Sequence, residues 1–330
     1  MMRNRRPTWL LTALLTALIA GLAVGGLALA GKPPKGGSGG GSVPLGTIYF
    51  LNVDLDVCLS MRGDGSVKTL SACDEPSYQT HDGTRWFLTR LYVTDLDGTR
   101  HAELFAVTED GLTLQLTDDP TVTPSWYFFR WAKDDSFLSY VGVIHAADGS
   151  QETALFVADV DWSLGLPVIA LPQPILYGDI LAHDWSPFGD EVVYTRPSEA
   201  YGHYLLEVTT FFADGSTFTH SLSEGRNPEW SPDGRRIAFD RGEIWTILPD
   251  GTGAVQLTKA TLDGGGENQQ DGPTWSPDGK FLAFTENIHK QKGFQPTVYS
   301  YNVLRISADG GKTTNLTDDI GNSGGPRWRP

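Results

Sequence analysis

The stretch Trp-Ser-Pro-Asp-Gly at residues 230–234 decides the fold, because an identical copy stands at residues 275–279. Each copy is followed by a short apolar run, then by an Asp-Gly pair and a Leu-Thr pair. A unit that recurs with a period of roughly 40 to 50 residues is typical of a repeat architecture. Within the unit, proline presets φ, aspartate accepts local N–H groups and glycine adopts the left-handed conformation. Each copy therefore predicts a tight turn after a strand.

Tryptophans extend this period to most of the chain. Each tryptophan of the series is expected in the first strand of a unit, and all but the last are followed by three more short strands. The series is Trp86, Trp131, Trp185, Trp230, Trp275 and Trp328. No amphipathic helix pattern of ten residues competes with the strand pattern. The chain is therefore predicted to be all-β.

The two ends of the repeat region complete one another. Residues 326–330 predict a first strand with no strand after it, whereas residues 47–53, 57–61 and 67–71 predict three strands with no first strand before them. Together they make one full unit. We therefore expect a six-bladed β-propeller of four-stranded antiparallel blades, with the ring closed by the C-terminal strand completing the N-terminal blade.

The repeated motif resembles that of TolB-type β-propellers. The resemblance rests on Trp-Ser-Pro-Asp-Gly-(Arg/Lys)-x-(Ile/Leu)-Ala-Phe and covers about residues 46–330. The same repeat occurs in the propeller domains of dipeptidyl-peptidase and prolyl-oligopeptidase relatives. The resemblance implies the fold and says little about function, because the motif residues are scaffold. TolB has an α/β domain before its propeller, and the peptidase relatives have an α/β-hydrolase domain; neither is expected here.

The N-terminal region is predicted to direct export. Three arginines at positions 3, 5 and 6 precede the uncharged stretch 9–30, which ends in Ala-Leu-Ala. This pattern predicts a signal peptide over residues 1–30. An uncleaved membrane anchor is the open alternative, since the stretch is long enough to span a bilayer. Residues 31–45 are a Gly/Pro/Ser-rich linker. Both interpretations place residues 46–330 outside the cytoplasm, in the periplasm or secreted.

The net charge limits the class of partner, and the two cysteines allow a disulfide. The formal net charge of −15 argues against nucleic acid, which needs a basic surface. Membrane contact is expected only through an uncleaved N-terminal segment, and the chain is expected to be a monomer. Cys58 and Cys73 flank a predicted hairpin, so they form either a disulfide or two separate buried thiols.

Acidic residues in the loops give the candidate binding site. In a propeller, the connections before each first strand and those between the second and third strands lie on one face, around the mouth of the channel. The candidate residues are Asp118, Asp119, His183, Asp184, Glu229, Asp271, Asp318 and Asp319. They predict a non-catalytic protein that binds a protein or peptide partner. Simple solvation of acidic loops is the open alternative.

Histidines on the same predicted face allow a second function. His81, His183, His203 and His289 lie in or beside these loops. If three or more imidazoles converge in the channel, the chain would be a metal-dependent propeller enzyme such as a polysaccharide lyase. No cofactor is expected for the binding protein, and a bound divalent cation remains open.

Overall fold

The computed structural model describes most of the repeat region. The described residues are 46–52, 57–66, 69–71, 78–81, 84–95, 98–108, 110–132, 134–198, 203–259, 262–263, 266–267, 269–290, 298–318 and 323–329. The predicted signal peptide and linker lie outside them. Within the described ranges, no helix is long and apolar enough to cross a membrane.

The stretch at residues 230–234 forms the predicted turn between two strands. Gly234 adopts a φ of 71° and donates its N–H to the carbonyl of Ser231 at 2.9 Å. The Asp233 carboxylate accepts the Ser231 hydroxyl and the N–H of Arg235. The sheet built around this turn is β17 (Arg226–Trp230), β18 (Ile237–Asp240), β19 (Ile244–Ile247) and β20 (Val255–Gln256).

The same order of antiparallel neighbours recurs in the other large sheets. One sheet holds β13 (Ala182–Trp185), β14 (Glu191–Pro197), β15 (Tyr204–Phe211) and β16 (Thr217–Glu224). Another holds β23 (Gln269–Trp275), β24 (Phe281–Lys290), β25 (Val298–Ser307) and β26 (Thr314–Asn315). A small hairpin of β21 (Leu262–Asp263) and β22 (Gly266–Glu267) precedes this second sheet in the chain.

Two further sheets come earlier in the chain. The first holds β4 (Tyr78–His81), β5 (Thr84–Thr94), β6 (Arg100–Thr108) and β7 (Thr113–Gln115). The second holds β8 (Val122–Trp131), β9 (Phe137–His145) and β10 (Gln151–Asp161), with β11 (Val168–Ile169) and β12 (Gln173–Tyr177) both pairing β10. The outer position of this sheet is thus shared by two short strands, because β10 is long enough to pair both.

The remaining sheet joins the two ends of the repeat region, as predicted. It holds β27 (Ser323–Arg329), β1 (Thr47–Asn52), β2 (Val57–Arg62) and β3 (Thr69–Ser71). Strand β27 pairs antiparallel with β1, and Thr47 lies opposite Arg329. Trp328 is buried at 3% exposure, so the last strand contributes to the core of the fold.

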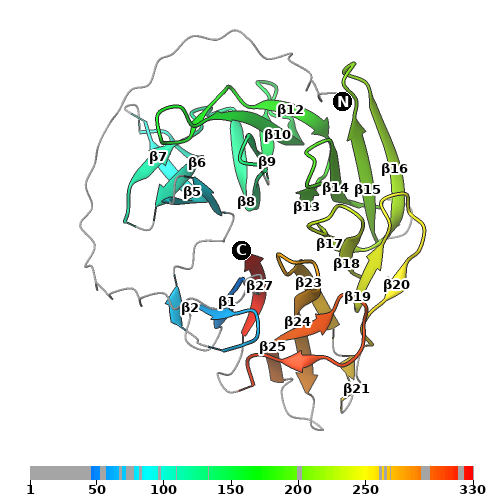
Figure 1. The fold of residues 1–330 in the computed structure, drawn as a ribbon. Helices are drawn as coiled ribbons and strands as arrows, with labels where there is room; N and C mark the ends of the chain where they lie inside the picture. Colours follow the sequence, from blue (N-terminus) through cyan, green and yellow to red (C-terminus); the bar gives the residue numbers. More distant parts are fainter. Residues whose placement is uncertain are drawn as a thin grey trace, which may run out of the picture.

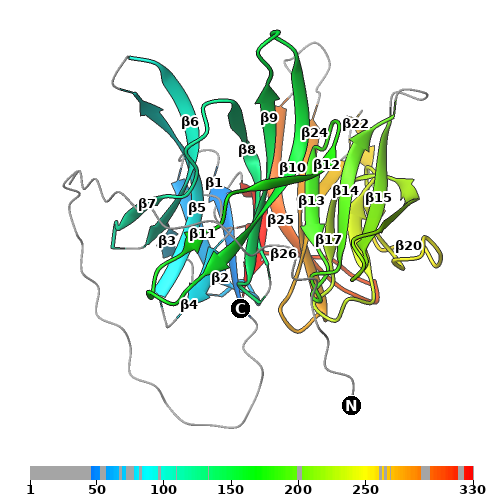
Figure 2. The same cartoon turned by 90° about the horizontal axis from the view of Figure 1, so that it is seen from above.

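The sheets stand around a common centre, which is the arrangement of a β-propeller (Figures 1 and 2). In Figure 1, β8, β13, β17, β23 and β27 lie nearest to this centre. The six-blade count and the closure of the ring between the sheet of β1 and the sheet of β5 stay predictions.

Apolar clusters join consecutive sheets, and the repeat tryptophans lie in them. Trp230 packs with Val193 and Val208 of the preceding sheet, and Trp275 packs with Ala238 and Leu257 in the same way. All six tryptophans of the series are buried. The motif tryptophan is therefore a packing residue between sheets, because a propeller blade can bury its faces only against its neighbours.

Two details depart from the regular repeat, and the first of them differs from the sequence prediction. Trp86 was expected in a first strand but lies in the second strand β5, after β4. Residues 86–94 contain no proline or glycine that would break the strand, so one long strand forms there. The turn after β8 lacks the glycine of the other units, and Asp135 adopts a φ of 53° in its place. Aspartate tolerates this left-handed conformation better than most residues.

Candidate functional site

The inner strands of five sheets surround a cavity near the common centre of the sheets. It has a volume of about 240 Å³ and is called the central cavity here. Its lining residues are Arg130, Ala182, Asn227, Pro228, Glu229, Gly272, Pro273 and Arg327. These residues come from β8, β13, β17, β23 and β27, so the cavity lies where the blades converge. Two guanidinium groups and a carboxylate give it mixed charge.

At three places, the residue before a repeat tryptophan accepts a hydrogen bond from the next inner strand. Asp184 accepts the N–H of Trp230 at 2.8 Å, and Glu229 accepts the N–H of Trp275 at 2.9 Å. Thr274 continues the series, because its hydroxyl accepts the N–H of Trp328 at 3.1 Å. These hydrogen bonds give Asp184 and Glu229 a structural role between sheets. A binding role for them stays a prediction.

Arg130 adds a charged group to this inner ring. Its Nε lies 4.0 Å from Oδ1 of Asp184, and both side chains are largely buried. Its Nη1 also donates to the carbonyl of Phe129. On the other side of the cavity, Arg327 donates to the carbonyl of Pro326. A backbone carbonyl thus holds each guanidinium group at the cavity wall.

Two acidic side chains stand directly behind the cavity wall. The Asp240 carboxylate accepts the Asn227 side-chain amide at 2.7 Å and the Gly272 N–H at 3.2 Å, while Arg226 Nε lies 3.4 Å from its other oxygen. Burial raises the pKa of Asp240 to about 6 in spite of these partners. The neighbouring Asp271 accepts the Asn287 amide, and burial raises its pKa too.

His183 lies away from solvent. Its side chain is fully buried, and its Nε2 lies 2.8 Å from the hydroxyl of Ser139, which also accepts the indole N–H of Trp185. Burial, with the Arg130 charge as a smaller cause, lowers the pKa of His183 well below 6.5. The imidazole is therefore neutral at physiological pH. A ligand would reach it only after repacking of these side chains.

Asp118, Asp119 and Asp318 do not line the central cavity. Asp118 is exposed and Asp119 half-buried, both between β7 and β8, and the N–H of Asp119 donates to Glu103. Asp318 is exposed after β26. Asp319 and Cys73 lie outside the described residues, so the disulfide with Cys58 stays a prediction.

The histidines proposed for a metal-dependent enzyme are only partly described. His203 is exposed before β15, and nothing is described of the His81 and His289 side chains. Among the described residues, the one group of three or more metal-binding side chains that lie close together contains a different histidine, His101.

Two residues of the central cavity were not singled out from the sequence. Arg130 and Arg327 occupy the position before a repeat tryptophan, as Asp184 and Glu229 do. Aligning the repeats on tryptophan and asking which side chain precedes it would have found them. The search for acidic loops passed over them because they are basic and lie within strands.

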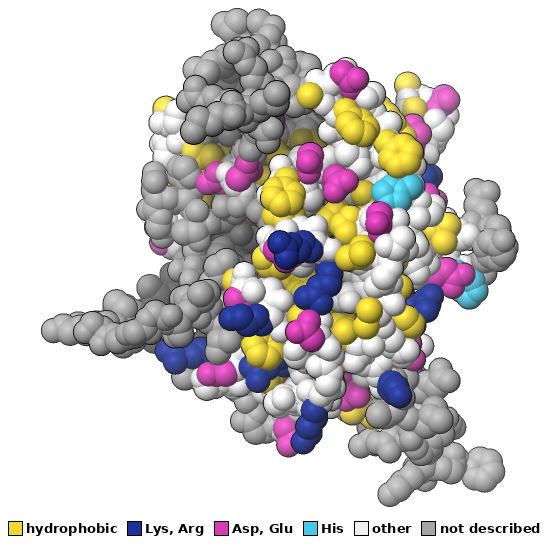
Figure 3. Space-filling view, turned by 45° about the vertical axis from the view of Figure 1, so that its right-hand side comes forward, with side chains coloured by type: hydrophobic (Ala, Val, Ile, Leu, Met, Phe, Trp, Pro, Cys, Tyr) yellow, Lys and Arg dark blue, Asp and Glu magenta, His cyan; other side chains and the backbone are white. Residues whose placement is uncertain are grey.

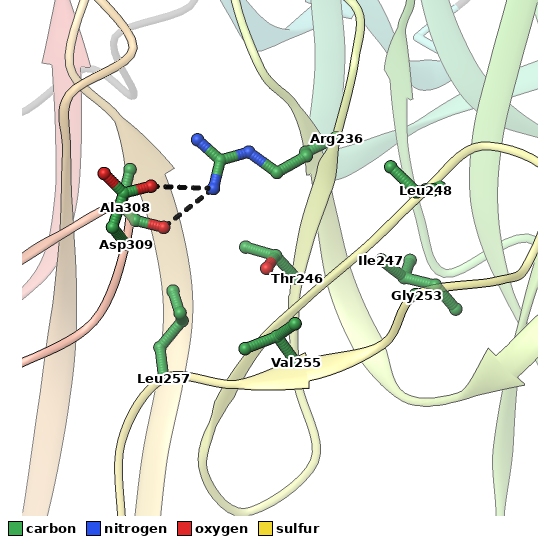
Figure 4. Close-up of a pocket in the computed structure, with 9 residues that line it drawn as sticks. All are labelled: Arg236, Thr246, Ile247, Leu248, Gly253, Val255, Leu257, Ala308 and Asp309. Atoms are coloured by element: carbon green, nitrogen blue, oxygen red, sulfur yellow. Dashed lines mark hydrogen bonds and ion pairs between the residues drawn. The ribbon is translucent and has the colours of Figure 1, made fainter.

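A second cavity lies between the sheets of β17–β20 and β23–β26 (Figure 4). It has a volume of about 230 Å³, and Leu248, Val255 and Leu257 supply its apolar wall. Arg236 spans its edge, donating to the Ala308 carbonyl at 2.8 Å and approaching the Asp309 carboxylate at 3.7 Å. These contacts tie the turn after β25 to the neighbouring sheet, so this cavity is a seam between blades.

The surface shown in Figure 3 bears on the acidity of the chain. In this view, acidic, basic and apolar side chains are interspersed, and neither acidic nor basic side chains alone cover the visible face. The net charge of −15 is therefore not concentrated there.

Comparisons with known proteins found similar solved structures. No family model and no curated protein matches the chain. Similar solved structures include a hypothetical selenium-binding protein from Sulfolobus tokodaii, with 10% identity, coverage of 87% of this chain and 94% of that chain, and a TM-score of 0.50. A periplasmic gluconolactonase from Pseudomonas aeruginosa is 12% identical, with coverage of 86% and 99% and a TM-score of 0.47.

A third similar structure is described as a β-propeller domain. It is the β-propeller domain of Cps50 (Swd1) from Myceliophteria thermophila, with 10% identity, coverage of 73% of this chain and 90% of that chain, and a TM-score of 0.42. At such low identity these likenesses concern the fold alone. The resemblance to TolB-type propellers in particular stays a prediction.

Proposed function

We propose that this chain is an exported, non-catalytic binding protein of the TolB-like kind. In this proposal a closed ring of six blades presents its channel mouth to a protein or peptide partner. The central cavity is the observation that carries the proposal, because it gathers Arg130, Glu229 and Arg327 from three different sheets. Binding sites are typically concave and hold a few convergent polar groups.

The size and charge of the cavity favour a peptide or a protein loop. A volume of about 240 Å³ accommodates one side chain or a chain end rather than a whole folded domain. Its guanidinium groups are suited to a carboxylate of the partner, and Glu229 is suited to a donor. A carboxylate on a neighbouring loop, such as Asp318, would extend the contact to basic residues of the partner.

The alternative of a metal-dependent enzyme needs several imidazoles at the channel. Within the described part of the chain, His183 is buried against Ser139 and His203 is exposed before β15. Neither of these two histidines lines the central cavity, so the binding protein is the function we propose.

A displayed library of random peptides tests the proposal. The full chain should enrich peptides with a shared motif, and Arg327→Gln should weaken their affinity at least tenfold. Arg235→Gln is the matched control, because Arg235 is 84% exposed in a turn outside the cavity and should leave the affinity unchanged. Failure to enrich any motif, or equal loss in both variants, would refute binding at the central cavity.

A further inference from the structure

Three side chains from the β4–β7 sheet and the connection that follows it converge, and none of them lines the central cavity. His101 and Glu103 lie on β6, and Asp118 lies in the connection from β7 to β8. One ligand atom from each lies within 4.8 Å of the other two. We call these three residues the His101 cluster. The connection between β5 and β6 adds Asp95, whose Oδ2 is 3.4 Å from Nδ1 of His101.

The burial of His101 makes this cluster unusual. Only 9% of its side chain is exposed, and neither ring nitrogen makes a hydrogen bond within the described residues. Nevertheless, Nε2 lies 3.2 Å from Oε1 of Glu103. A neutral imidazole carries one N–H and cannot donate to both carboxylates that face it, so a cation between Nε2 and the Glu103 oxygen would satisfy this buried pair.

The distance between the two ligand atoms fits a shared metal ion. Atoms that each lie about 2.1 Å from one ion stand about 3.0–3.4 Å apart at octahedral or tetrahedral angles. The separation of 3.2 Å between His101 and Glu103 falls within this range. Asp118 is exposed, so its carboxylate can turn the short distance needed to complete a third bond.

Surrounding groups hold the buried carboxylate in place. Oε2 of Glu103 accepts the hydroxyl of Thr117, and Oε1 accepts the N–H of Asp119 at 3.0 Å. The Glu103 side chain is 1% exposed, so it is fixed before any ion arrives. Metal ligands in proteins are commonly oriented by such outer contacts, and a carboxylate beside the second nitrogen of a ligating histidine is a recurrent example.

The geometry points to a divalent transition-metal site, with Nε2 of His101, Oε1 of Glu103 and a carboxylate oxygen of Asp118 as its ligands. Asp95 is a positioning residue, because it faces the other ring nitrogen. One imidazole with two carboxylates suits Zn²⁺, whereas Ca²⁺ takes six to eight oxygen ligands. Three protein ligands leave a fourth position open for water or an outside ligand. The site does not depend on the proposed function of the central cavity.

Calorimetric titration of the metal-free full chain with Zn²⁺ tests this site. We expect one Zn²⁺ per chain, with at least 100-fold weaker binding in His101→Ala and about tenfold weaker binding in Asp118→Asn. His203→Ala is the matched control, because this exposed histidine lies outside the cluster and its loss should leave the affinity unchanged. Co²⁺ should give the visible absorption of a four-coordinate site in the wild type and lose it in His101→Ala.

The variants separate loss of metal from loss of fold. His101 is buried, so its alanine variant is compared with the wild type by near-ultraviolet circular dichroism. Asp118 is exposed, so Asp118→Asn should keep the fold whatever happens at His101. The site is refuted if wild-type chain binds no Zn²⁺, if Asp118→Asn binds as tightly as wild type, or if Ca²⁺ displaces Zn²⁺ at equal concentration.

Discussion

At the scale of single residues, Asp240 joins Asn227 and Gly272 behind the central cavity through hydrogen bonds, but the burial of its carboxylate lowers the stability of the fold. Its carboxylate is fully buried, and its Oδ2 makes no hydrogen bond within the described residues, although Arg226 lies 3.4 Å away. Desolvation outweighs the hydrogen bonds to its other oxygen, and the pKa therefore rises from 3.8 to about 6. The folded chain keeps a proton there at pH values where the unfolded chain has lost it.

This raised pKa predicts a pH-dependent effect of Asp240→Asn. Above pH 3.8 the unfolded chain binds fewer protons at this position than the folded chain, so the contribution of Asp240 to stability falls as the pH rises to about 6. Moving the pKa from 3.8 to about 6 corresponds to about 3 kcal/mol. About 1 kcal/mol of this has already developed at pH 4.5, so the gain in unfolding free energy from Asp240→Asn should grow by about 2 kcal/mol between pH 4.5 and pH 7.

Urea denaturation at pH 4.5, 5.5 and 7 measures this difference. Comparing variant with wild type at each pH cancels the opposite trend from His183, whose lowered pKa costs stability below pH 6.5. Asp148→Asn is the control, because hydrogen bonds from the Ser150 hydroxyl and N–H lower the pKa of Asp148. Its difference should not grow with pH. A constant effect of Asp240→Asn would contradict the burial argument.

At the scale of elements, the repeat shows which features a sequence can predict. The predicted Ser-Pro-Asp-Gly turn is confirmed. It could be predicted because its hydrogen bonds join residues at most five positions apart. The bonds from Asp184 and Glu229 to the next tryptophan join residues 46 positions apart. Such contacts follow from how the blades are set around the centre, and no local propensity encodes them. Arg130 and Arg327 were missed for a different reason, because the prediction of the site considered acidic loops and these two residues are basic and lie within strands.

The hydrogen bonds that Glu229 accepts from the next inner strand predict that Glu229→Ala and Glu229→Gln differ in their loss of stability. Glu229→Ala removes the acceptor for the Trp275 N–H and the Thr274 hydroxyl, both buried. Leaving buried donors without an acceptor costs about 1–3 kcal/mol. Glu229→Gln keeps an oxygen at the same place and should lose less than about 1 kcal/mol. Thermal and urea unfolding of both variants measure the contrast, and equal losses would mean that the charge, rather than the acceptor, matters.

At the scale of the whole molecule, stability depends on sheets that are joined in series. Five apolar clusters each connect two consecutive sheets, and one of them holds Trp328 of β27 against Ile48, Met61 and Val303. Strand β27 is therefore shared between the pairing with β1 and the packing against the preceding sheet. Removing β27 would expose apolar side chains of both the sheet of β1 and the sheet of β23–β26.

Deleting residues 323–330 should therefore destabilise the whole ring. Losing one buried tryptophan alone costs about 3–5 kcal/mol, and the deletion also exposes Ile48 and Met61. We expect a marked fall in Tm and a broader unfolding transition by circular dichroism. Trp328→Ala in the full-length chain is the intermediate case, because it removes the side chain but keeps the pairing of β27 with β1.

A rearranged chain then distinguishes loss of the strand from loss of its position in the sequence. Thr47 lies opposite Arg329, so residues 323–330 placed directly before Gly46 would form a hairpin with β1 through a two-residue connection of Pro330 and Gly46. This permuted chain should recover most of the Tm lost in the deletion. Trp328→Ala introduced into it should remove that recovery, because the strand acts through its packing. A permuted chain no more stable than the deletion would show that β27 does not complete the sheet of β1.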